Sequence, residues 1–261
     1  MILAALLSSF FTIYPWNIGG SIYNTTGTYT DGGSSVSKAG YFSMDRRSKD
    51  GFVIGYEDLL IEKDNDTYRQ FNWMGRDVFW IKPSLRFIGL VGHLSSSNSD
   101  DAWIAGVQAE GDLPWLGYSF GFIRSDYQLW NPYALFDTWE NLLIDQYDFH
   151  LSRKLGPVVA RLGTMNQKVD DNNYSMIQLT ITGNIIDKIT GSVSYSSGES
   201  LYAIDPYLLV INNNPEILNE SMAIRSTYKL NPNFYISGIW TQHKYDLYNI
   251  QYLSVGLTGR F

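Results

Sequence analysis

The sequence predicts an all-β protein, namely a transmembrane, antiparallel, up-and-down β-barrel of about 14 strands, with 12 strands as the second choice. Three observations lead to this prediction. Short segments alternate between apolar and polar residues, the connections between them alternate between longer and shorter, and the last segment ends on an aromatic residue. We therefore treat residues 16–261 as one barrel domain.

The composition excludes several other classes of protein. Hydrophobic residues make up 44% of the chain, but no uninterrupted apolar run approaches the ~20 residues that a membrane-spanning helix needs. There is no cysteine, so neither a disulfide framework nor a thiolate metal site is possible. The formal net charge of −7 argues against nucleic acid as a partner. We expect no cofactor and no metal.

Residues 1–15 are mostly apolar but lack the basic start of a secretory signal. Two interpretations remain open for them, a remnant of an export signal or the start of the first strand.

The alternation is clearest in the second half of the chain. In residues 176–185, Ile177, Leu179 and Ile181 share one face, while Gln178 and Thr180 share the other. A soluble sandwich also alternates. Here, however, the polar face is mostly Ser, Thr, Gln, Asn and Gly, with few of the Lys and Glu residues expected on a solvated sheet, which favours the interior of a barrel.

The connections between segments supply the next argument. We expect 13 of them, with the odd-numbered ones mostly long, among them residues 30–38, 95–101, 129–141 and 199–220, and the even-numbered ones short. Barrels of outer membranes show this inequality. With 13 turns, both chain ends fall on the side of the short turns.

The last segment, "YLSVGLTGRF", has apolar residues at every second position and ends on an aromatic ring. It resembles the C-terminal strand by which the Gram-negative assembly machinery recognises outer-membrane β-barrel proteins, whose members typically end in Phe. Gly259 departs from the aromatic residue that is common at the third position from the end. The resemblance assigns the assembly signal to Leu253, Val255, Leu257 and Phe261. It implies the bacterial outer membrane as location, with both termini in the periplasm, and outer-membrane lipids, lipopolysaccharide and the barrel assembly machinery as partners.

Several aromatic residues are expected at the membrane boundaries. Trp16, Trp80 and Trp115 lie near the short-turn ends of predicted strands, and Tyr127 and Trp130 lie near a long-loop end. Ordinary packing is the alternative. The residues expected to face lipid are Trp73, Trp103 and Trp240.

Charged residues on the polar faces predict a lumen that tunes selectivity. The residues are Arg76, Glu110, Asp112, Asp148, His150, Arg161, Arg225, Lys229, His243 and Arg260. The acidic ones come from residues 103–152 and most basic ones from the last third, so the two signs can face each other across the lumen. The alternative is that they pair and fill a narrow interior.

One motif suggests enzymatic chemistry. His93 and Ser95 are two residues apart and point to the same side of one strand, where an imidazole can activate a hydroxyl, and Asn98 follows in the next connection. The spacing is similar to that of outer-membrane phospholipase A and the lipid A deacylase barrels. Those families place an Asn directly after the Ser, whereas Ser96 stands there in this chain.

The sequence thus predicts a passive channel or porin for small solutes or ions, and not an enzyme. The alternatives are an outer-membrane lipid hydrolase that uses His93 and Ser95, and a non-catalytic barrel that serves export, adhesion or assembly. The oligomeric state and the transported solute stay open.

Overall fold

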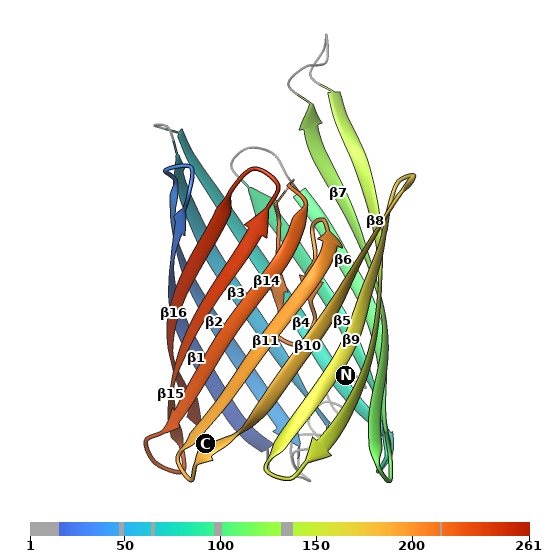
Figure 1. Ribbon diagram of the computed structural model, residues 1–261, viewed down its shortest axis with the longest axis vertical. Helices are drawn as coiled ribbons and strands as arrows, with labels where there is room; N and C mark the ends of the chain where they lie inside the picture. Colours follow the sequence, from blue (N-terminus) through green and yellow to red (C-terminus); the bar gives the residue numbers. More distant parts are fainter. Residues whose placement is uncertain (1–15, 47–49, 64–65, 97–100, 132–137, 215) are drawn as a thin grey trace, which may run out of the picture.

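The chain forms a closed, antiparallel β-barrel of 14 strands, as a computed structural model shows (Figure 1). The structure describes residues 16–46, 50–63, 66–96, 101–131, 138–214 and 216–261. The predicted fold and strand number are confirmed, and residues 1–15 lie outside the described part. Within that part, no helix is long and apolar enough to cross a membrane.

The barrel strands are β1 (Trp16–Tyr29), β2 (Ser34–Arg46), β3 (Asp50–Lys63), β4 (Asp66–Lys82), β5 (Leu85–Ser96), β6 (Asp101–Leu113), β7 (Leu116–Asn131), β8 (Thr138–Leu155), β9 (Val158–Val169), β10 (Asn172–Ile186), β11 (Ile189–Ser200), β14 (Leu218–Lys229), β15 (Phe234–Tyr245) and β16 (Asn249–Arg260). Two further strands, β12 (Ile204–Asp205) and β13 (Val210–Ile211), form a separate hairpin.

Each barrel strand pairs with its neighbours along the chain, and β1 pairs with β16 to close the ring. Gly19 lies opposite Arg260, and the amide of Ile18 donates a hydrogen bond of 2.9 Å to the carbonyl of Phe261. The start of β1 and the end of β16 therefore lie at one end of the barrel, which we call the terminal end (Figure 1). The opposite end, where β1 turns into β2, is called the loop end.

Several connections at the loop end are shorter than the sequence suggested. β2 begins at Ser34, so the first turn covers only residues 30–33, and β9 and β10 are joined by residues 170–171 alone. Gly32 and Asp170 adopt positive φ angles of 99° and 50°, as such tight turns require. The prediction of long odd-numbered connections was wrong at these places, because strand pairing continues to the tips of the hairpins. Residues 201–217 remain the long connection between β11 and β14.

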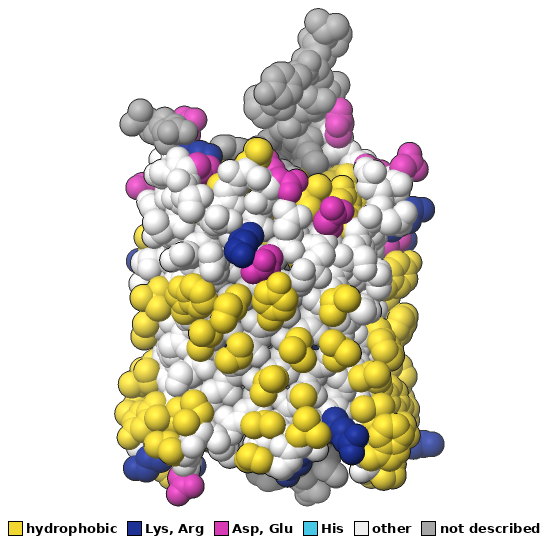
Figure 2. Space-filling model, viewed as in Figure 1, with side chains coloured by type: hydrophobic (Ala, Val, Ile, Leu, Met, Phe, Trp, Pro, Cys, Tyr) yellow, Lys and Arg dark blue, Asp and Glu magenta, His cyan; other side chains and the backbone are white. Residues whose placement is uncertain are grey.

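The outward face is apolar over most of its height. Figure 2 shows hydrophobic side chains in a broad band, with acidic side chains mostly above it towards the loop end. Ile22 is 65% exposed and Trp103 is 62% exposed on the outward face. Such a surface is suited to lipid, because the backbone groups behind it are paired within the sheet.

The inward face is divided into two unlike sides. Towards the loop end, β4 to β8 present apolar residues such as Met74, Leu94 and Ile123, all of which are buried. The strands from β10 through β16 to β1 mainly present serine, threonine and tyrosine, and many of these side chains are partly exposed. The interior is therefore filled most densely beside β4 to β8.

Tyrosine rings lie over glycines of β16 and β3. An added Cβ on Gly256 would lie 2.3 Å from the ring of Tyr23, and one on Gly55 would lie 2.6 Å from the ring of Tyr41. The two rings meet edge to face, with centroids 5.8 Å apart. Glycine is needed here because the ring occupies the space of a side chain.

Candidate functional site: the interior of the barrel

Residues 201–214 and 216–217, here called the inner segment, fold back into the lumen and carry the β12–β13 hairpin (Figure 1). Four apolar side chains of this segment are buried against the apolar side of the barrel: Tyr202, Ile204, Leu209 and Ile211. Burying an apolar side chain of this size is worth roughly 1.5–3 kcal/mol. The apolar inward residues of β4 to β8 thus have a partner inside the barrel.

Polar contacts fix the inner segment at defined positions. The side chain of Gln146 donates to the carbonyl of Ile204 at 2.8 Å and accepts from its amide at 3.1 Å. Gln167 accepts a hydrogen bond of 2.9 Å from the amide of Leu201. Both glutamines are buried on adjacent strands, so they replace the backbone pairing that this part of the segment lacks.

The tip of the hairpin is a compact turn. Oδ1 of Asp205 accepts hydrogen bonds from the amides of Tyr207 and Leu208, at 2.8 and 2.9 Å. Arg76 donates to the carbonyl of Tyr207 at 3.2 Å. The turn and this arginine hold the ring of Tyr207 in the lumen.

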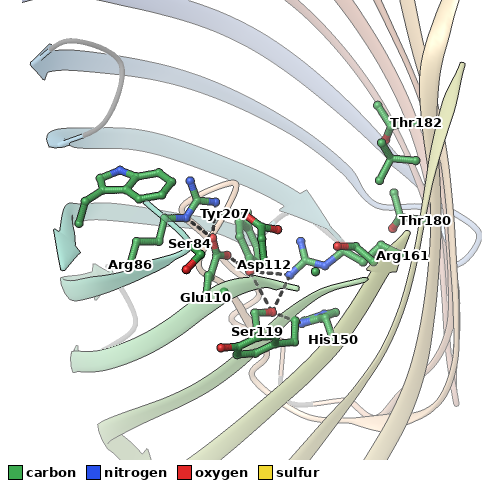
Figure 3. A pocket seen from close by; sticks show the side chains of 16 residues that line it. Ser84, Arg86, Glu110, Asp112, Ser119, His150, Arg161, Thr180, Thr182 and Tyr207 are labelled. Atoms are coloured by element: carbon green, nitrogen blue, oxygen red, sulfur yellow. Dashed lines mark hydrogen bonds and ion pairs between the residues drawn. The ribbon is translucent and has the colours of Figure 1, made fainter. Parts of the chain in front are cut away.

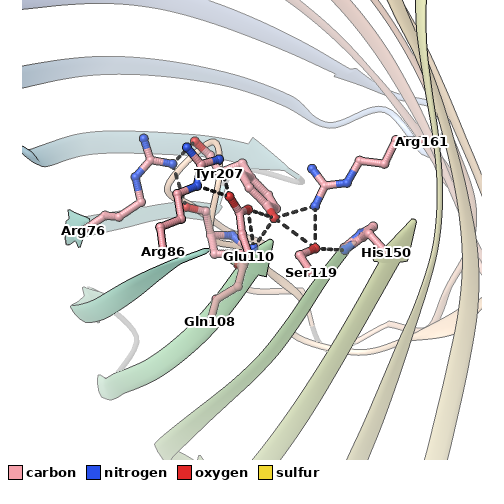
Figure 4. Close-up of polar contacts among 9 residues, drawn as sticks. Arg76, Arg86, Gln108, Glu110, Ser119, His150, Arg161 and Tyr207 are labelled. Carbon is pink, nitrogen blue, oxygen red and sulfur yellow. Dashed lines mark hydrogen bonds and ion pairs between the residues drawn. The ribbon is translucent and has the colours of Figure 1, made fainter. Parts of the chain in front are cut away.

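The hydroxyl of Tyr207 is the centre of a polar network (Figure 4). It donates to Oε1 of Glu110 at 2.5 Å and accepts from Nη2 of Arg161 at 2.5 Å. Gln108 also bonds to this hydroxyl, and Arg86 forms an ion pair with Glu110. Side chains from β5, β6 and β9 therefore meet at the tip of the inner segment.

A cavity of about 410 Å³ lies beside this network (Figure 3). Charged, hydroxyl and aromatic groups line it together. Its lining includes the side chains of Trp80, Arg86, Glu110, Asp112, Ser119, His150, Ser152, Arg161, Thr180, Thr182 and Tyr207. Its volume lies in the range of small-molecule sites, about 300–1,000 Å³.

The inner segment also reaches the other side of the barrel near the loop end. Asn212 accepts a hydrogen bond from the hydroxyl of Tyr245 at 3.2 Å, and Asn214 donates to the hydroxyl of Tyr248 at 2.9 Å. Tyr29 and Ile250 pack in the same buried cluster. The interior is consequently most crowded at the loop end.

The predicted lumen residues all lie on the inward face. Arg76, Glu110, Asp112 and Arg161 surround the inner segment or its cavity. His150 also lines the cavity. The others are distributed along the inward face: Asp148, Arg225, Lys229, His243 and Arg260. Asp148 accepts a hydrogen bond of 2.9 Å from Gln146 and is not among the hydrogen-bond partners found for Arg161 in the described chain.

The expected separation of charge is only partial. Arg76 and Arg86 lie on the same side of the barrel as Glu110, and Arg86 neutralises it directly. Arg225 lies apart from them, on β14. Arg86 was missed in the sequence, although its alternation with Phe87 would have placed it inside. Tyr207 was missed because it lies in a connection without strand periodicity.

Two predicted boundary aromatics lie inside instead. Tyr127 is fully buried and its ring packs on Tyr202, with centroids 4.8 Å apart. Trp80 lines the cavity, with the guanidinium of Arg86 5.3 Å from its ring centroid. Both side chains point into the barrel, so the prediction that they lie at the membrane boundary was wrong. Trp115 is 63% exposed, as a boundary residue would be.

The side chains of Trp16 and Trp130 lie outside the described part of the structure. Trp73 and Trp240 fall on the outward face together with Trp103, as expected.

His93 and Ser95 lie on the outward face, as their positions in the alternating pattern of the strand predict. Nε2 of His93 is 3.8 Å from Oδ1 of Asp101, and the imidazole packs on Trp103 with centroids 4.5 Å apart. No hydrogen bond joins His93 to Ser95 among the described residues, and Asn98 lies outside them. The geometry thus lacks the contact by which an imidazole activates a serine.

Comparisons with known proteins place the fold. No protein-family model matches the sequence, and no curated protein matches it significantly. OmpT of Vibrio cholerae, an outer membrane protein, is 8% identical with a TM-score of 0.51, covering 94% of this chain and 97% of that chain. CymD, a monoaromatic hydrocarbon channel, is 8% identical with a TM-score of 0.56, covering 95% of this chain and 89% of that chain. The chain therefore has the fold of outer-membrane β-barrel proteins.

Proposed function

We propose that this protein is a passive channel of the bacterial outer membrane, through which small polar solutes and ions diffuse around the inner segment. One observation carries the proposal. The inner segment packs on β4 to β9 and leaves the inward side chains across the barrel partly exposed, among them Ser192, Ser194, Arg225, Thr227, Tyr23 and Thr25.

The chemistry of that exposed side supports passage of polar solutes. Hydroxyl groups of Ser192, Ser194 and Thr227 line β11 and β14, and Arg225 adds a positive charge between them. Such groups replace part of the hydration shell of a solute without binding it tightly. The segment that narrows the lumen sets a size limit, because it is held by hydrogen bonds at both Gln146 and Arg76.

We further propose that both chain ends are periplasmic and that the last strand carries the assembly signal. The turns at the terminal end are short, with two residues each after β4, β6, β8 and β10, which is typical of periplasmic turns. Leu253, Val255 and Leu257 all point to the membrane side and are more than 40% exposed. The channel needs no cofactor in this proposal, and its partners are the outer-membrane lipids, lipopolysaccharide and the assembly machinery.

The proposal excludes a lipid hydrolase at His93. Its imidazole contacts Asp101 and Trp103, and among the described residues no hydrogen bond from His93 to Ser95 is found.

Planar bilayers test the channel. The folded barrel, identified by its different gel mobility before and after boiling, is expected to give discrete conductance steps, and the boiled protein is expected to give none. Absence of conductance from the folded, heat-modifiable form would contradict the proposal.

A further inference from the structure

The geometry points to a binding site for the carboxylate group of a small organic solute, centred on Arg161 in the cavity beside Tyr207 (Figure 3). This inference rests on the proposed channel function and names the class of solute that the channel recognises.

Three polar side chains form a row across adjacent strands. Arg161 on β9 lies directly opposite Ser152 on β8 and Thr180 on β10. All three line the cavity, and so does Thr182, two residues further along β10. A carboxylate in front of this row meets one guanidinium with hydroxyl groups on both sides, which is a suitable set of donors for two oxygens.

The guanidinium of Arg161 is held in place by uncharged groups. It lies 4.1 Å from the ring centroid of Tyr207, and its Nη2 donates to Tyr207 at 2.5 Å and to Ser119 at 3.3 Å. Both acceptors are hydroxyl oxygens. The side chain is thus fixed before any ligand arrives, which lowers the entropic cost of binding.

Arg161 also has unused binding capacity. No carboxylate lies within 4.0 Å of it in the described part of the chain, and its Nε and Nη1 make no hydrogen bond there. Arg86, the other arginine of the cavity, is instead paired with Glu110. Glu110 additionally accepts from Gln108 and Tyr207, so its oxygens are already occupied. Only one of the two cations is therefore available to a solute (Figure 4).

Asp112 restricts the kind of solute. It lines the same cavity from β6, and among the described residues it forms no ion pair. A second negative charge on the solute would meet this carboxylate. The site is therefore expected to prefer a monocarboxylate, with a neutral or cationic remainder, over a dicarboxylate.

Isothermal titration calorimetry of the detergent-folded barrel tests the site, with benzoate as the probe. Benzyl alcohol has a similar shape without the charge and serves as the neutral comparison, and succinate tests the dicarboxylate. We expect benzoate to bind more tightly than both. Arg161→Gln should weaken benzoate binding at least about tenfold, since it removes a charge-assisted contact. Thr180→Val should weaken it less.

Arg225→Gln is the matched control, because it removes the same charge from another part of the lumen and should change benzoate affinity less than about twofold. Equal binding of benzoate and benzyl alcohol, or unchanged benzoate binding in Arg161→Gln, would overturn the site. Calorimetry does not depend on conduction. A barrel that binds benzoate through Arg161 but conducts no ions keeps the site and contradicts the channel, whereas one that conducts but does not bind benzoate contradicts the site alone.

Discussion

The hydroxyl of Tyr207 donates a 2.5 Å hydrogen bond to Glu110, a residue 97 positions earlier in the chain. Tyr207 lies at the tip of the inner segment and Glu110 lies on the barrel strand β6. This contact links the position of the tip to the charge of the lumen, because the same carboxylate is paired with Arg86 and the same hydroxyl accepts from Arg161. Changes in the segment are therefore expected to alter conduction as well as stability.

Replacing Gln146 should loosen the inner segment. Gln146→Ala removes both hydrogen bonds to Ile204, with an expected loss of roughly 1–3 kcal/mol in stability because buried backbone groups lose their partners. We expect a larger and noisier single-channel conductance. Gln178→Ala is the control, since the side-chain hydrogen bond found for Gln178 in the described structure goes to His150 on the barrel. An unchanged conductance in Gln146→Ala would show that the segment does not limit the flow of ions.

Ion selectivity should respond to Arg225. Arg225→Gln removes a positive charge from the partly exposed side of the lumen, which makes the local potential more negative and favours cations. The reversal potential in a salt gradient should shift accordingly. Arg225→Lys keeps the charge and should keep the selectivity. A shift of the same size in both variants would mean that the shape of the side chain matters and not its charge.

The glycine under Tyr23 should be sensitive to substitution. In Gly256→Ala the new Cβ would lie 2.3 Å from the ring of Tyr23, so the ring must move, at a cost of roughly 1–3 kcal/mol. Gly89→Ala is the matched control, because nothing lies within 4 Å of an added Cβ at Gly89. The temperature at which the folded gel mobility is lost measures both. Equal temperatures for the two variants would contradict the packing argument.

Ser95 should have no catalytic role. Purified protein and its Ser95→Ala variant are expected to release no fatty acid from phospholipid or lipid A, because no hydrogen bond from His93 to Ser95 is found in the described structure. Activity above background that disappears in Ser95→Ala would instead establish a hydrolase on the outer face of the barrel.

Removal of Phe261 should separate assembly from folding. The ring of Phe261 is 70% exposed and packs edge to face on Phe234, with centroids 5.7 Å apart, so the ring contributes little to stability. Deletion also removes the two backbone hydrogen bonds between Phe261 and Ile18, a small part of the pairing of β1 with β16. We expect the shortened chain to fold in detergent and to accumulate poorly in the outer membrane of cells. Phe234→Leu removes the ring contact while keeping the chain end and is the control. Normal accumulation of the shortened chain would show that the assembly signal lies elsewhere.

The barrel was predictable because its strands repeat with a period of two residues. The alternation at Ile177 and Leu179 predicts which side chains face outward, and the same rule predicts that Arg161 and Glu110 face the lumen, where the structure has them. The inner segment has no such repeat. Its apolar residues, such as Leu209 and Ile211, indicate that the segment is buried. They do not indicate which strands the segment packs against, because that depends on contacts between distant parts of the chain. The cavity at Tyr207 therefore could not be predicted from the sequence alone.

Pairing of β1 with β16 has a kinetic consequence. The contact between Gly19 and Arg260 joins the two ends of the described chain, so it is a contact of very high sequence separation, which slows folding. Until β16 docks, β1 exposes one row of unsatisfied amide and carbonyl groups, and these are costly in hydrocarbon. A partly inserted sheet is thus an unstable intermediate, and insertion and ring closure are expected to occur as one cooperative event, with a single transition for the whole chain.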